Sequence, residues 1–414
     1  MYNIFKQLPS NVEKPNVVII ESGWGFGGSV VSLRKTTEVL RQAGWRVRLL
    51  VMHGESNVIK YLTLDGLKVV SMGMGYRRPD KVHSFLTHLK KTVGKLAKWL
   101  VNFCIIVVEI PFFLYPMINL AWWLFRWKPE LVVLNNQYDG LLSLAIRLSG
   151  IGCRVIYHAR GFLAVSLLNP LPTRKWPFII ANSFAVKDCF HSLGWPVDRV
   201  KVVYNSFDFA GKFEHIKPVT DESWATDNML RVALVGRLEP WKGHELFLEV
   251  ARLIIKKRSN VKFYVVGGED ASTRGRIAEL METAGYLGVS DHIVFLGLRL
   301  DVYRVVKTMD IVVLTSIDPE PFGNVIVEAM LLGRAVVAAD EGGPKEIITH
   351  ETDGLLVTPR NPLALTEAVE RLLVDKDLRE RLGKNAVTSA SQRFSHARYC
   401  SEILDAYKSV LLEV

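Results

Sequence analysis

The sequence predicts an α/β fold made of two doubly wound, Rossmann-like domains that face each other across a cleft. Short β-branched runs alternate with helical patterns along the chain, which is typical of parallel α/β layers. The runs are almost continuously apolar, as expected for strands covered on both faces. A chain of 414 residues, 49% of them hydrophobic, can build two cores. Ligands of such sheets bind beyond the carboxyl ends of the strands, so the cleft is the expected site.

The expected strands fall into two groups, one in each half of the chain. Those of the first half are Val17–Ile20, Val47–Val51, Lys68–Ser71, Leu131–Leu134, Arg154–Tyr157, Phe178–Ala181 and Lys201–Tyr204. Those of the second half are Arg231–Val235, Lys262–Val266, His292–Leu296, Ile311–Leu314, Ala335–Ala338 and Leu355–Val357. Residues 209–229 between the groups are polar and acidic and show no periodicity, so we interpret them as a linker. The domains are then expected at residues 1–208 and 230–393.

The end of the chain, residues 394–414, predicts a helix that buries one face. Ser395 is a suitable N-cap for this helix. The residues that follow at four-residue spacing and share a face are Tyr399, Ile403, Tyr407 and Leu411. We therefore expect the helix to pack against a domain.

The charge balance and the cysteines limit the partners and the location of the protein. Lysine and arginine outnumber aspartate and glutamate by 52 to 42, and the net charge of +10 favours sugar nucleotides, nucleic acid or an acidic membrane surface as partners. The cysteines are too far apart to form a zinc or redox pair; they are Cys104, Cys153, Cys189 and Cys400. We expect them to be buried apolar residues of a protein on the cytosolic side, since no secretory signal precedes the first strand.

A glycine-rich loop follows the first expected strand. It runs from Glu21 to Gly28 and precedes a helix at about Ser29–Ala43, which Gly44 ends. Glycine backbone and the free amides of a helix N-terminus can bind an anion. The spacing differs from the G-x-G-x-x-G dinucleotide pattern. Alone, the loop favours phosphate only modestly, and a tight strand-to-helix turn is the alternative.

Two cations follow the first strand of the second half. This strand runs into Gly236 and Arg237 and, after a short turn, into Lys242 and Gly243. Each cation alone would be explained as surface charge. Two of them at the carboxyl end of a strand, flanked by glycines, suit a diphosphate whose negative charge grows as a glycosidic bond breaks.

Two glutamates follow the strand at Ile311–Leu314. Glu320 precedes a helix that is expected to begin near residues 321–324, and Glu328 lies within that helix. A carboxylate can accept two hydroxyl hydrogens at once, so both residues suit the recognition of a polyol. The alternative is one capping acid and one surface acid. Because Glu328 lies in an apolar stretch, we expect it to have a partner.

These motifs resemble family 4 of the retaining GT-B glycosyltransferases, also called glycosyl transferases group 1. The resemblance rests on Gly236-Arg237, Lys242-Gly243, the E-x7-E motif of Glu320 and Glu328, Gly333, Gly342-Gly343-Pro344 and Gly354-Leu-Leu-Val357. In the first half, Gly27-Gly28, His158, Asn182-Ser183 and Asn205-Ser-Phe-Asp208 fit the same pattern. The resemblance covers nearly the whole chain and is most specific between residues 236 and 354.

The resemblance implies that a sugar is transferred from a nucleotide-diphosphate sugar with retention of configuration, by front-face attack. Arg237 and Lys242 would bind the diphosphate, Glu328 the ribose and Glu320 the sugar hydroxyls. His158 would lie beside the donor sugar, whereas Arg160 next to it has no assigned role. The other implied donor contacts are Gly27, Gly28, Gly236, Phe322, Gly323, Asn324 and Val325. No cofactor or metal is implied, and the C-terminal helix would pack on the N-terminal domain.

The most unusual part of the chain is the apolar stretch at residues 99–127. A single transmembrane span would carry Glu109 and two prolines and would divide the first sheet, while buried core helices are a second interpretation. Tryptophans near its end and basic residues on both sides favour a monotopic helical hairpin, so we interpret 84–128 as a membrane-associating segment. Since the N-terminal domain is expected to bind the acceptor, a lipid-linked saccharide at the cytosolic membrane face is the expected acceptor, in surface polysaccharide or glycolipid assembly.

Other functions are less consistent with the sequence. A sugar-nucleotide epimerase of the same fold, or a transferase with a soluble acceptor, leaves the apolar stretch unexplained. A nucleic-acid-binding protein would account for the charge, but the sequence has no recognisable binding module and its basic residues are dispersed. An inactive binding subunit would not need the intact set of two cations and two glutamates.

Overall fold

The computed structural model describes residues 14–21, 28–52, 56–63, 66–72, 118–135, 140–163, 177–270 and 272–412. The chain forms two compact units. The first unit comprises Met1–Ala181, Cys189–Val202 and Cys400–Val414, and the second comprises Asn182–Asp188 and Val203–Tyr399.

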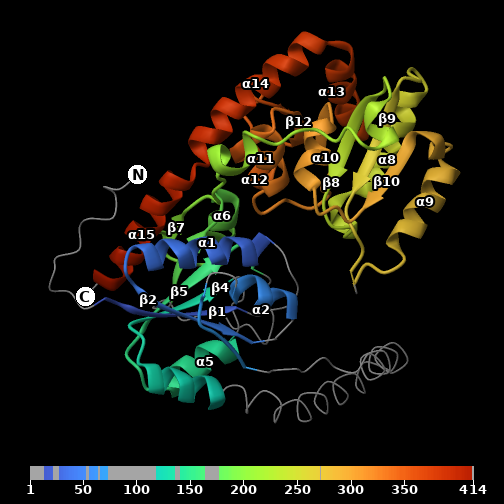
Figure 1. Ribbon diagram of the computed structural model, residues 1–414. Coiled ribbons are helices and arrows are strands. Elements are labelled where there is room, and N and C mark those ends of the chain that lie inside the picture. The colour runs from blue at the N-terminus through green and yellow to red at the C-terminus, as the bar shows by residue number, and fades with distance from the viewer. Residues whose placement is uncertain are drawn as a thin grey trace. The chain divides into compact units, whose positions relative to one another are not determined.

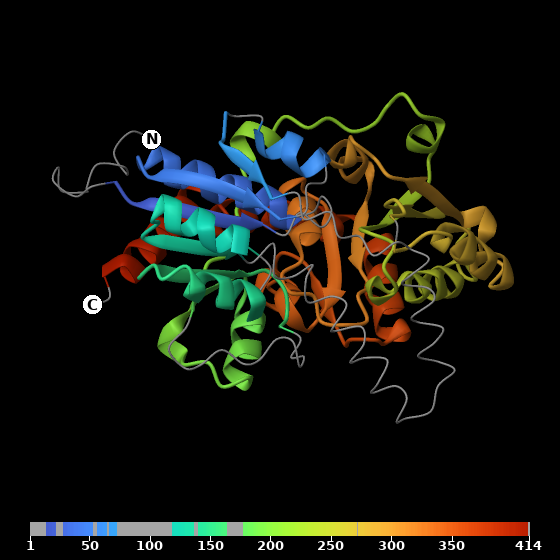
Figure 2. The ribbon, with the colours of Figure 1, turned by 90° about the horizontal axis from the view of Figure 1, so that it is seen from below.

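The described part of the first unit contains a parallel sheet of seven strands in the order β3-β2-β1-β4-β5-β6-β7. The strands are β1 (Asn16–Glu21), β2 (Arg46–Val51), β3 (Val69–Ser71), β4 (Leu131–Asn135), β5 (Arg154–Ala159), β6 (Phe178–Ala181) and β7 (Val200–Val202). Every strand predicted for this half is present, although the last lies slightly before its predicted position. The strands lie between α1 (Gly28–Gln42) on one side and α5 (Gly140–Leu148) on the other (Figure 1 and Figure 2). The nearly continuous apolar runs are therefore covered on both faces, as predicted.

The helices of this unit follow from apolar spacing and from breakers. In α1 the side chains of Leu33, Thr37 and Leu40 share one face and are buried, and Gly44 ends the helix with a φ of 84°. The other helical elements are α2 (Ser56–Thr63), α6 (Phe184–Ser192), whose first residues belong to the second unit, and the 3-10 turn η1 (Val197–Arg199).

The described part of the second unit contains a parallel sheet of six strands in the order β10-β9-β8-β11-β12-β13. The strands are β8 (Leu230–Val235), β9 (Val261–Val266), β10 (Ile293–Gly297), β11 (Ile311–Leu314), β12 (Ala335–Ala339) and β13 (Leu355–Val357). All of the strands predicted for the second half are present.

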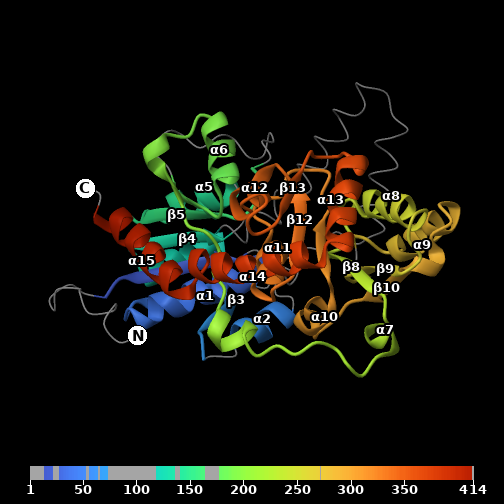
Figure 3. The same cartoon turned by 90° about the horizontal axis from the view of Figure 1, so that it is seen from above.

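Alternate residues of these strands face two different cores, because side chains alternate across a strand. In β8, Ala233 and Val235 join one core, and Val232 and Leu234 join the other. The first core includes side chains of α10 (Val302–Thr308), α11 (Asn324–Leu331) and α12 (Gly342–Ile347). The second includes side chains of α8 (His244–Ile255), α9 (Arg276–Tyr286) and α13 (Pro362–Val374). Figure 3 shows these helices around the strands of the second unit.

The segment that we interpret as a linker is packed along the second unit. Phe213 and Val219 are buried in its first core, and the Val219 amide donates to Thr308 Oγ1 at 2.8 Å. The centroid of the Trp224 ring lies 5.3 Å from that of the Tyr264 ring. The segment forms the π-helix η2 (Phe209–Phe213) and the short helix α7 (Ser223–Thr226). Its few apolar side chains are too widely spaced to produce a helical or strand period, which explains why the sequence pattern gives no sign of this packing.

The C-terminal residues contribute to both units. Helix α14 (Lys376–Arg393) packs on the second unit, and α15 (His396–Leu412) follows it. The Ser395 hydroxyl accepts a hydrogen bond from the Arg398 amide, as expected of an N-cap. From Cys400 onward α15 belongs to the first unit, where Tyr407 lies 6.0 Å from the Trp45 ring.

The end of the apolar stretch is a helix at residues 118–127, and residues 99–117 lie outside the described residues. Leu120 and Leu124 are buried, whereas Ile118, Trp122 and Phe125 are exposed on the opposite face. This helix thus combines a core-facing side with an exposed apolar side. None of the described helices has the length and apolarity to cross a membrane.

The cysteines differ partly from the expectation. Cys400 is buried, but Cys153 and Cys189 are only half-buried, because Cys153 lies in the loop before β5 and Cys189 lies on α6 rather than in the sheet. Burial nevertheless raises the pKa of the Cys153 thiol to about 11. Cys104 lies outside the described residues.

Candidate functional site

Each sheet has one position at which the strand order reverses. In the first sheet it lies between β1 and β4, and in the second between β8 and β11. In parallel α/β sheets, loops diverge at this point beyond the carboxyl ends of the strands, and ligands bind there. The predicted site residues of the second unit can be compared with this position directly, because Lys242 follows β8 and Glu320 follows β11.

Lys242 and Glu320 form an ion pair across the reversal point of the second sheet. The Lys242 Nζ atom lies 2.9 Å from Glu320 Oε1 and 2.8 Å from Oε2. Each side chain is 12% exposed. The Ser316 hydroxyl donates to Glu320 Oε2 at 2.9 Å, and Lys242 Nζ lies 4.1 Å from the centroid of the Trp241 ring. The structure therefore brings together two of the predicted residues from loops 78 positions apart.

Backbone contacts fix the loop that carries Lys242 against the loop that carries Glu320. Lys242 ends the 3-10 turn η3 (Pro240–Lys242), and Gly243 follows with a φ of 71°. A Cβ atom at Gly243 would lie 2.0 Å from the Thr315 carbonyl oxygen, so only glycine fits. The Thr315 hydroxyl donates to the Lys242 carbonyl, and the Ile317 amide donates to the Trp241 carbonyl, each at 2.8 Å.

Arg237, the second predicted cation, is more exposed than Lys242. It follows Gly236 at the end of β8, and its side chain is 63% exposed. The Arg237 Nη1 atom lies 2.8 Å from Glu239 Oε1. An exposed, solvated guanidinium at a strand end can reorient toward a phosphate at little cost.

The predicted helix begins at Asn324, with Gly323 as its N-cap at a φ of 101°. Phe322 is buried against Tyr204 and Phe394, so its side chain is not available to a ligand. Val325 is half-buried in the first turn. Amides of this first turn point beyond the helix end, where they suit phosphate or sugar oxygens.

Glu328 lies one turn further along α11 and is half-buried. The Tyr303 hydroxyl donates to Glu328 Oε1 at 3.2 Å. The expectation that this acid has a partner is therefore confirmed.

The glycine pair after β12 packs against the Glu320 loop. The Gly343 amide donates to the Glu320 carbonyl at 2.8 Å. A Cβ atom at Gly343 would lie 2.2 Å from the Phe322 carbonyl oxygen. Close approach of two backbones thus explains why glycine stands at this position.

A different polar network lies at the reversal point of the first sheet. Asn135, the last residue of β4, donates from Nδ2 to the buried Glu21 carboxylate at the end of β1. The Arg160 Nε atom donates to Asn135 Oδ1 at 3.0 Å, and its Nη2 atom lies 3.2 Å from His158 Nδ1. The Tyr407 hydroxyl lies 2.9 Å from His158 Nε2. The network thus connects four strand-end residues to the C-terminal helix.

This network determines the protonation state of His158. Burial, followed by the nearby Arg160 charge, holds the pKa of His158 well below its usual range, so the ring is neutral at pH 7. Because a guanidinium can only donate, Nδ1 accepts and Nε2 carries the proton that it shares with the Tyr407 oxygen. Both ring nitrogens are therefore engaged inside the first unit. The predicted roles of His158 and Gly28 remain predictions, and Gly27 lies outside the described residues.

Several residues of these arrangements were not predicted from the sequence. Ser316 and Thr315 stand directly after a predicted strand, and that position was the available signal. Asn135 stands directly after the predicted strand Leu131–Leu134 and offered the same signal. The contact of Tyr407 with His158 gave none, because it depends on which strands and helices are neighbours. A further unpredicted residue is His244 at the start of α8, which is fully buried.

Among the described residues, neither ring nitrogen of His244 has a hydrogen-bond partner. Burial lowers the pKa of His244 to about 4. The ring is therefore neutral at pH 7 and occupies a core position next to the ion pair's loop.

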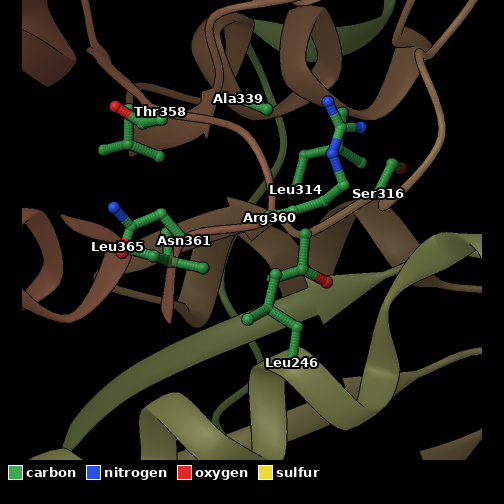
Figure 4. Close-up of a pocket in the computed structure, with 10 residues that line it drawn as sticks. Leu246, Leu314, Ser316, Ala339, Thr358, Arg360, Asn361 and Leu365 are labelled. Carbon is green, nitrogen blue, oxygen red and sulfur yellow. The ribbon is translucent and has the colours of Figure 1, made fainter. Parts of the chain in front are cut away.

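A small pocket lies at the carboxyl ends of β11, β12 and β13 (Figure 4). Its lining includes Thr315 and Ser316 of the Glu320 loop, Leu246 of α8, and Thr358 and Arg360 after β13. Within the described part of the chain, no three His, Cys, Asp or Glu side chains are arranged to hold a metal ion.

Comparisons with known proteins find related glycosyltransferases. A family model described as glycosyl transferases group 1 matches residues 221–388. The chain is 33% identical over 254 residues to an uncharacterized glycosyltransferase of Methanocaldococcus jannaschii, and the alignment covers 59% of this chain and 63% of that protein, less than two thirds of its length. It is 27% identical over 305 residues to the lipopolysaccharide core biosynthesis glycosyltransferase LpsD of Rhizobium meliloti, covering 71% of this chain and 82% of that protein.

Solved structures resemble the whole chain. Anabaena HepE in complex with UDP and glucose superimposes with a TM-score of 0.74 at 23% identity, over 95% of this chain and 100% of that chain. A glycosyltransferase from Rickettsia africae gives a TM-score of 0.76 at 17% identity, and the superposition covers 97% of this chain and 100% of that chain. At these identities the likeness concerns the fold. Residues 221–388 thus match the glycosyl transferases group 1 family, and the chain as a whole has the two-sheet α/β fold of GT-B glycosyltransferases.

Proposed function

We propose that this protein is a retaining glycosyltransferase that takes a sugar from a nucleotide-diphosphate sugar. The observation that carries the proposal is the Lys242–Glu320 ion pair at the reversal point of the second sheet, inside the segment that matches the family. A cation and a carboxylate placed side by side can serve the two chemically different ends of a sugar diphosphate.

In the proposed reaction, the bond between sugar C1 and the β-phosphate oxygen breaks while an acceptor hydroxyl oxygen bonds to C1 from the same face. The acceptor proton passes to the departing phosphate oxygen. Lys242 and Arg237 stabilise the negative charge that develops on the diphosphate. Glu320 accepts hydrogen bonds from the sugar hydroxyls and Glu328 from the ribose, while amides of the first turn of α11 contact sugar or phosphate oxygens.

The proposed mechanism needs no metal ion, because two side-chain cations are available to the diphosphate. Transfer should therefore continue at an unchanged rate in excess EDTA. Loss of activity in EDTA that returns with Mg²⁺ or Mn²⁺ would refute this part of the proposal.

We further propose UDP as the first nucleotide to test, because HepE is solved with UDP and with UDP-glucose. The acceptor that we propose is a lipid-linked saccharide, in keeping with the relative named for lipopolysaccharide core biosynthesis.

The exposed face of the helix at residues 118–127 supports a membrane location. Trp122 and Phe125 are 53% and 62% exposed, and the exposed cations Arg126 and Lys128 follow directly. Aromatic side chains beside basic residues are typical of a surface that rests on an anionic membrane. We propose peripheral binding to the cytosolic face through this helix.

The function is tested by incubating the purified protein with a panel of sugar nucleotides and measuring nucleoside diphosphate release, with and without a lipid extract. We expect release from one donor, stimulated by lipid and lost in Glu320→Gln. The matched control is Glu370→Gln, which removes an acid from a remote pair with Lys257 in the same unit. Release that survives Glu320→Gln would place the chemistry elsewhere.

The membrane proposal has its own test, sedimentation with anionic liposomes. The double variant Trp122→Ser, Phe125→Ser should lose binding, whereas Leu148→Ser, which removes an equally exposed apolar side chain from α5, should retain it. Equal sedimentation of all three proteins would refute the assignment of this face.

A further inference from the structure

Arg360 occupies a backbone conformation that is unusual for its residue type. It lies in the loop between β13 and α13 with a φ of 55°, and the only other non-glycine residues with positive φ in the described chain are Lys128 and Glu351. L-residues adopt this conformation only when the surroundings hold them in it. The contacts of the Arg360 side chain show what holds it.

The Arg360 guanidinium connects two separate loops. Its Nη1 atom donates to the Ile317 carbonyl at 2.7 Å and to Glu341 Oε1 at 2.8 Å, and its Nη2 atom donates to Glu341 Oε2 at 2.9 Å. In Figure 4 the side chain extends from the loop toward Leu314 and Ser316 at the end of β11. The bidentate pair with Glu341 fixes both the position and the plane of the guanidinium.

Both loops hold Glu320 in place. Ile317 lies in the loop that leads to Glu320, and its amide is bonded to the Trp241 carbonyl beside Lys242. Glu341 immediately precedes the glycine pair whose Gly343 amide is bonded to the Glu320 carbonyl. The backbone of Ile317 is therefore held at its N–H by the Lys242 loop and at its C=O by Arg360.

We propose that Arg360 is a positioning residue for the donor site. By binding the Ile317 carbonyl and the Glu341 carboxylate at once, its guanidinium clamps the loop that leads to Glu320 to the loop that follows β12. Because the backbone of Glu320 is bonded to the second of these loops, the clamp sets the orientation of the Glu320 carboxylate. This inference rests on the proposed function, in which Glu320 binds the donor sugar.

A contribution to stability alone does not explain the arrangement. The Arg360 side chain is 52% exposed, and exposed ion pairs add little to the stability of a folded protein. The pair nevertheless coexists with an unfavourable φ at Arg360. A role in holding the Glu320 loop explains why an arginine stands where glycine would be unstrained.

The test uses Arg360→Gly, which removes the clamp and at the same time relieves the backbone. Its thermal midpoint should not fall, because glycine is unstrained at this φ. Turnover should fall about 10-fold, since small misplacements of a catalytic group are costly, while the affinity for the nucleoside diphosphate stays within about 2-fold. Arg360→Lys keeps the charge but loses the planar, bidentate guanidinium. Its turnover should therefore lie between those of Arg360→Gly and the wild type.

The matched control is Glu351→Gly. Glu351 also has a positive φ, of 64°, and also forms an exposed bidentate pair, with Arg371. This variant should match the wild type in turnover.

Amide hydrogen exchange gives a readout that does not depend on knowing the donor. The Ile317 and Gly343 amides should exchange faster in Arg360→Gly and at the wild-type rate in Glu351→Gly. Unchanged exchange at both amides, or unchanged turnover in an active protein, would overturn the inference. A wild type that releases no nucleotide from any donor would instead count against the proposed function, and the exchange result would still decide the role of Arg360.

Discussion

The two sheets place different chemistry at equivalent positions. At the reversal point of the second sheet, Lys242 and Glu320 are oppositely charged, each 12% exposed, and carried on loops. At that of the first sheet, Glu21 and Asn135 end the strands themselves and are buried, and Arg160 and His158 extend their network to Tyr407. The ion pair can exchange partners with a ligand that has phosphates and hydroxyls, whereas the first network is built into the protein. The reversal position alone therefore does not distinguish the proposed donor site; the residues placed there differ in kind, an ion pair on loops in the second sheet and a strand-end network in the first.

The largest effect should come from breaking the ion pair. We expect Lys242→Met to reduce turnover about 10²–10³-fold, because the cation stabilises charge that appears as the bond breaks. Steady-state nucleotide release measures this. Lys257→Met, which breaks an exposed pair in the same unit, is the control and should stay near the wild-type rate. If Lys242→Met and Lys257→Met lower turnover equally, the ion pair at the reversal point is no more important for turnover than the exposed pair.

The second effect concerns the buried histidine next to the ion pair. The pKa of His244 is about 4 in the folded protein and about 6.5 when unfolded, so below pH 6.5 the unfolded state binds more protons. Stability should be complete above pH 6.5 and decline as the pH falls toward 4. The loss attributable to His244 between pH 7 and pH 5 should be about 2 kcal/mol.

Urea denaturation of the wild type and of His244→Leu at both pH values measures this loss. The variant should have the smaller pH dependence and should be no less stable at pH 7, because a buried ring without partners is replaced by an apolar side chain. Identical pH dependence in the two proteins would show that His244 does not titrate as described.

The smallest effect should come from the first network. Tyr407→Phe removes one buried hydrogen bond to His158 and should lower stability by about 1 kcal/mol. Turnover should change less than about 3-fold if the network supports the fold of the first unit rather than the chemistry. Thermal unfolding measures the effect on stability and nucleotide release the effect on turnover, both on the same preparation. A loss of turnover as large as that of Lys242→Met would make the first network part of the catalytic machinery.

The strands, and the charged loops that follow them, could be predicted from the sequence because their signals are local. Apolar runs mark each strand, and the glycines and charges near Lys242 and Glu320 lie directly after strands. The partners of these residues could not be predicted in the same way. Ser316 donates to a residue four positions later, but Arg360, Glu341 and Tyr407 reach their partners only through the strand order, which the sequence pattern does not specify.

The segment at residues 209–229 packs in a way that the sequence pattern does not predict. Its polar composition predicts a linker, yet Phe213 and Val219 are buried in the second unit. Isolated apolar residues in an irregular segment give no period to recognise, so only the packing shows their role.

The central claim is that the donor diphosphate binds at Lys242, and calorimetric titration tests it most directly. UDP, GDP, ADP and dTDP would be titrated into the wild type, and the tightest binder then into Lys242→Met and Lys257→Met. We predict that Lys242→Met weakens binding at least about 10-fold, as expected for the loss of one charge-assisted contact, and that Lys257→Met leaves it unchanged. Equal affinity in all three proteins would contradict the claim.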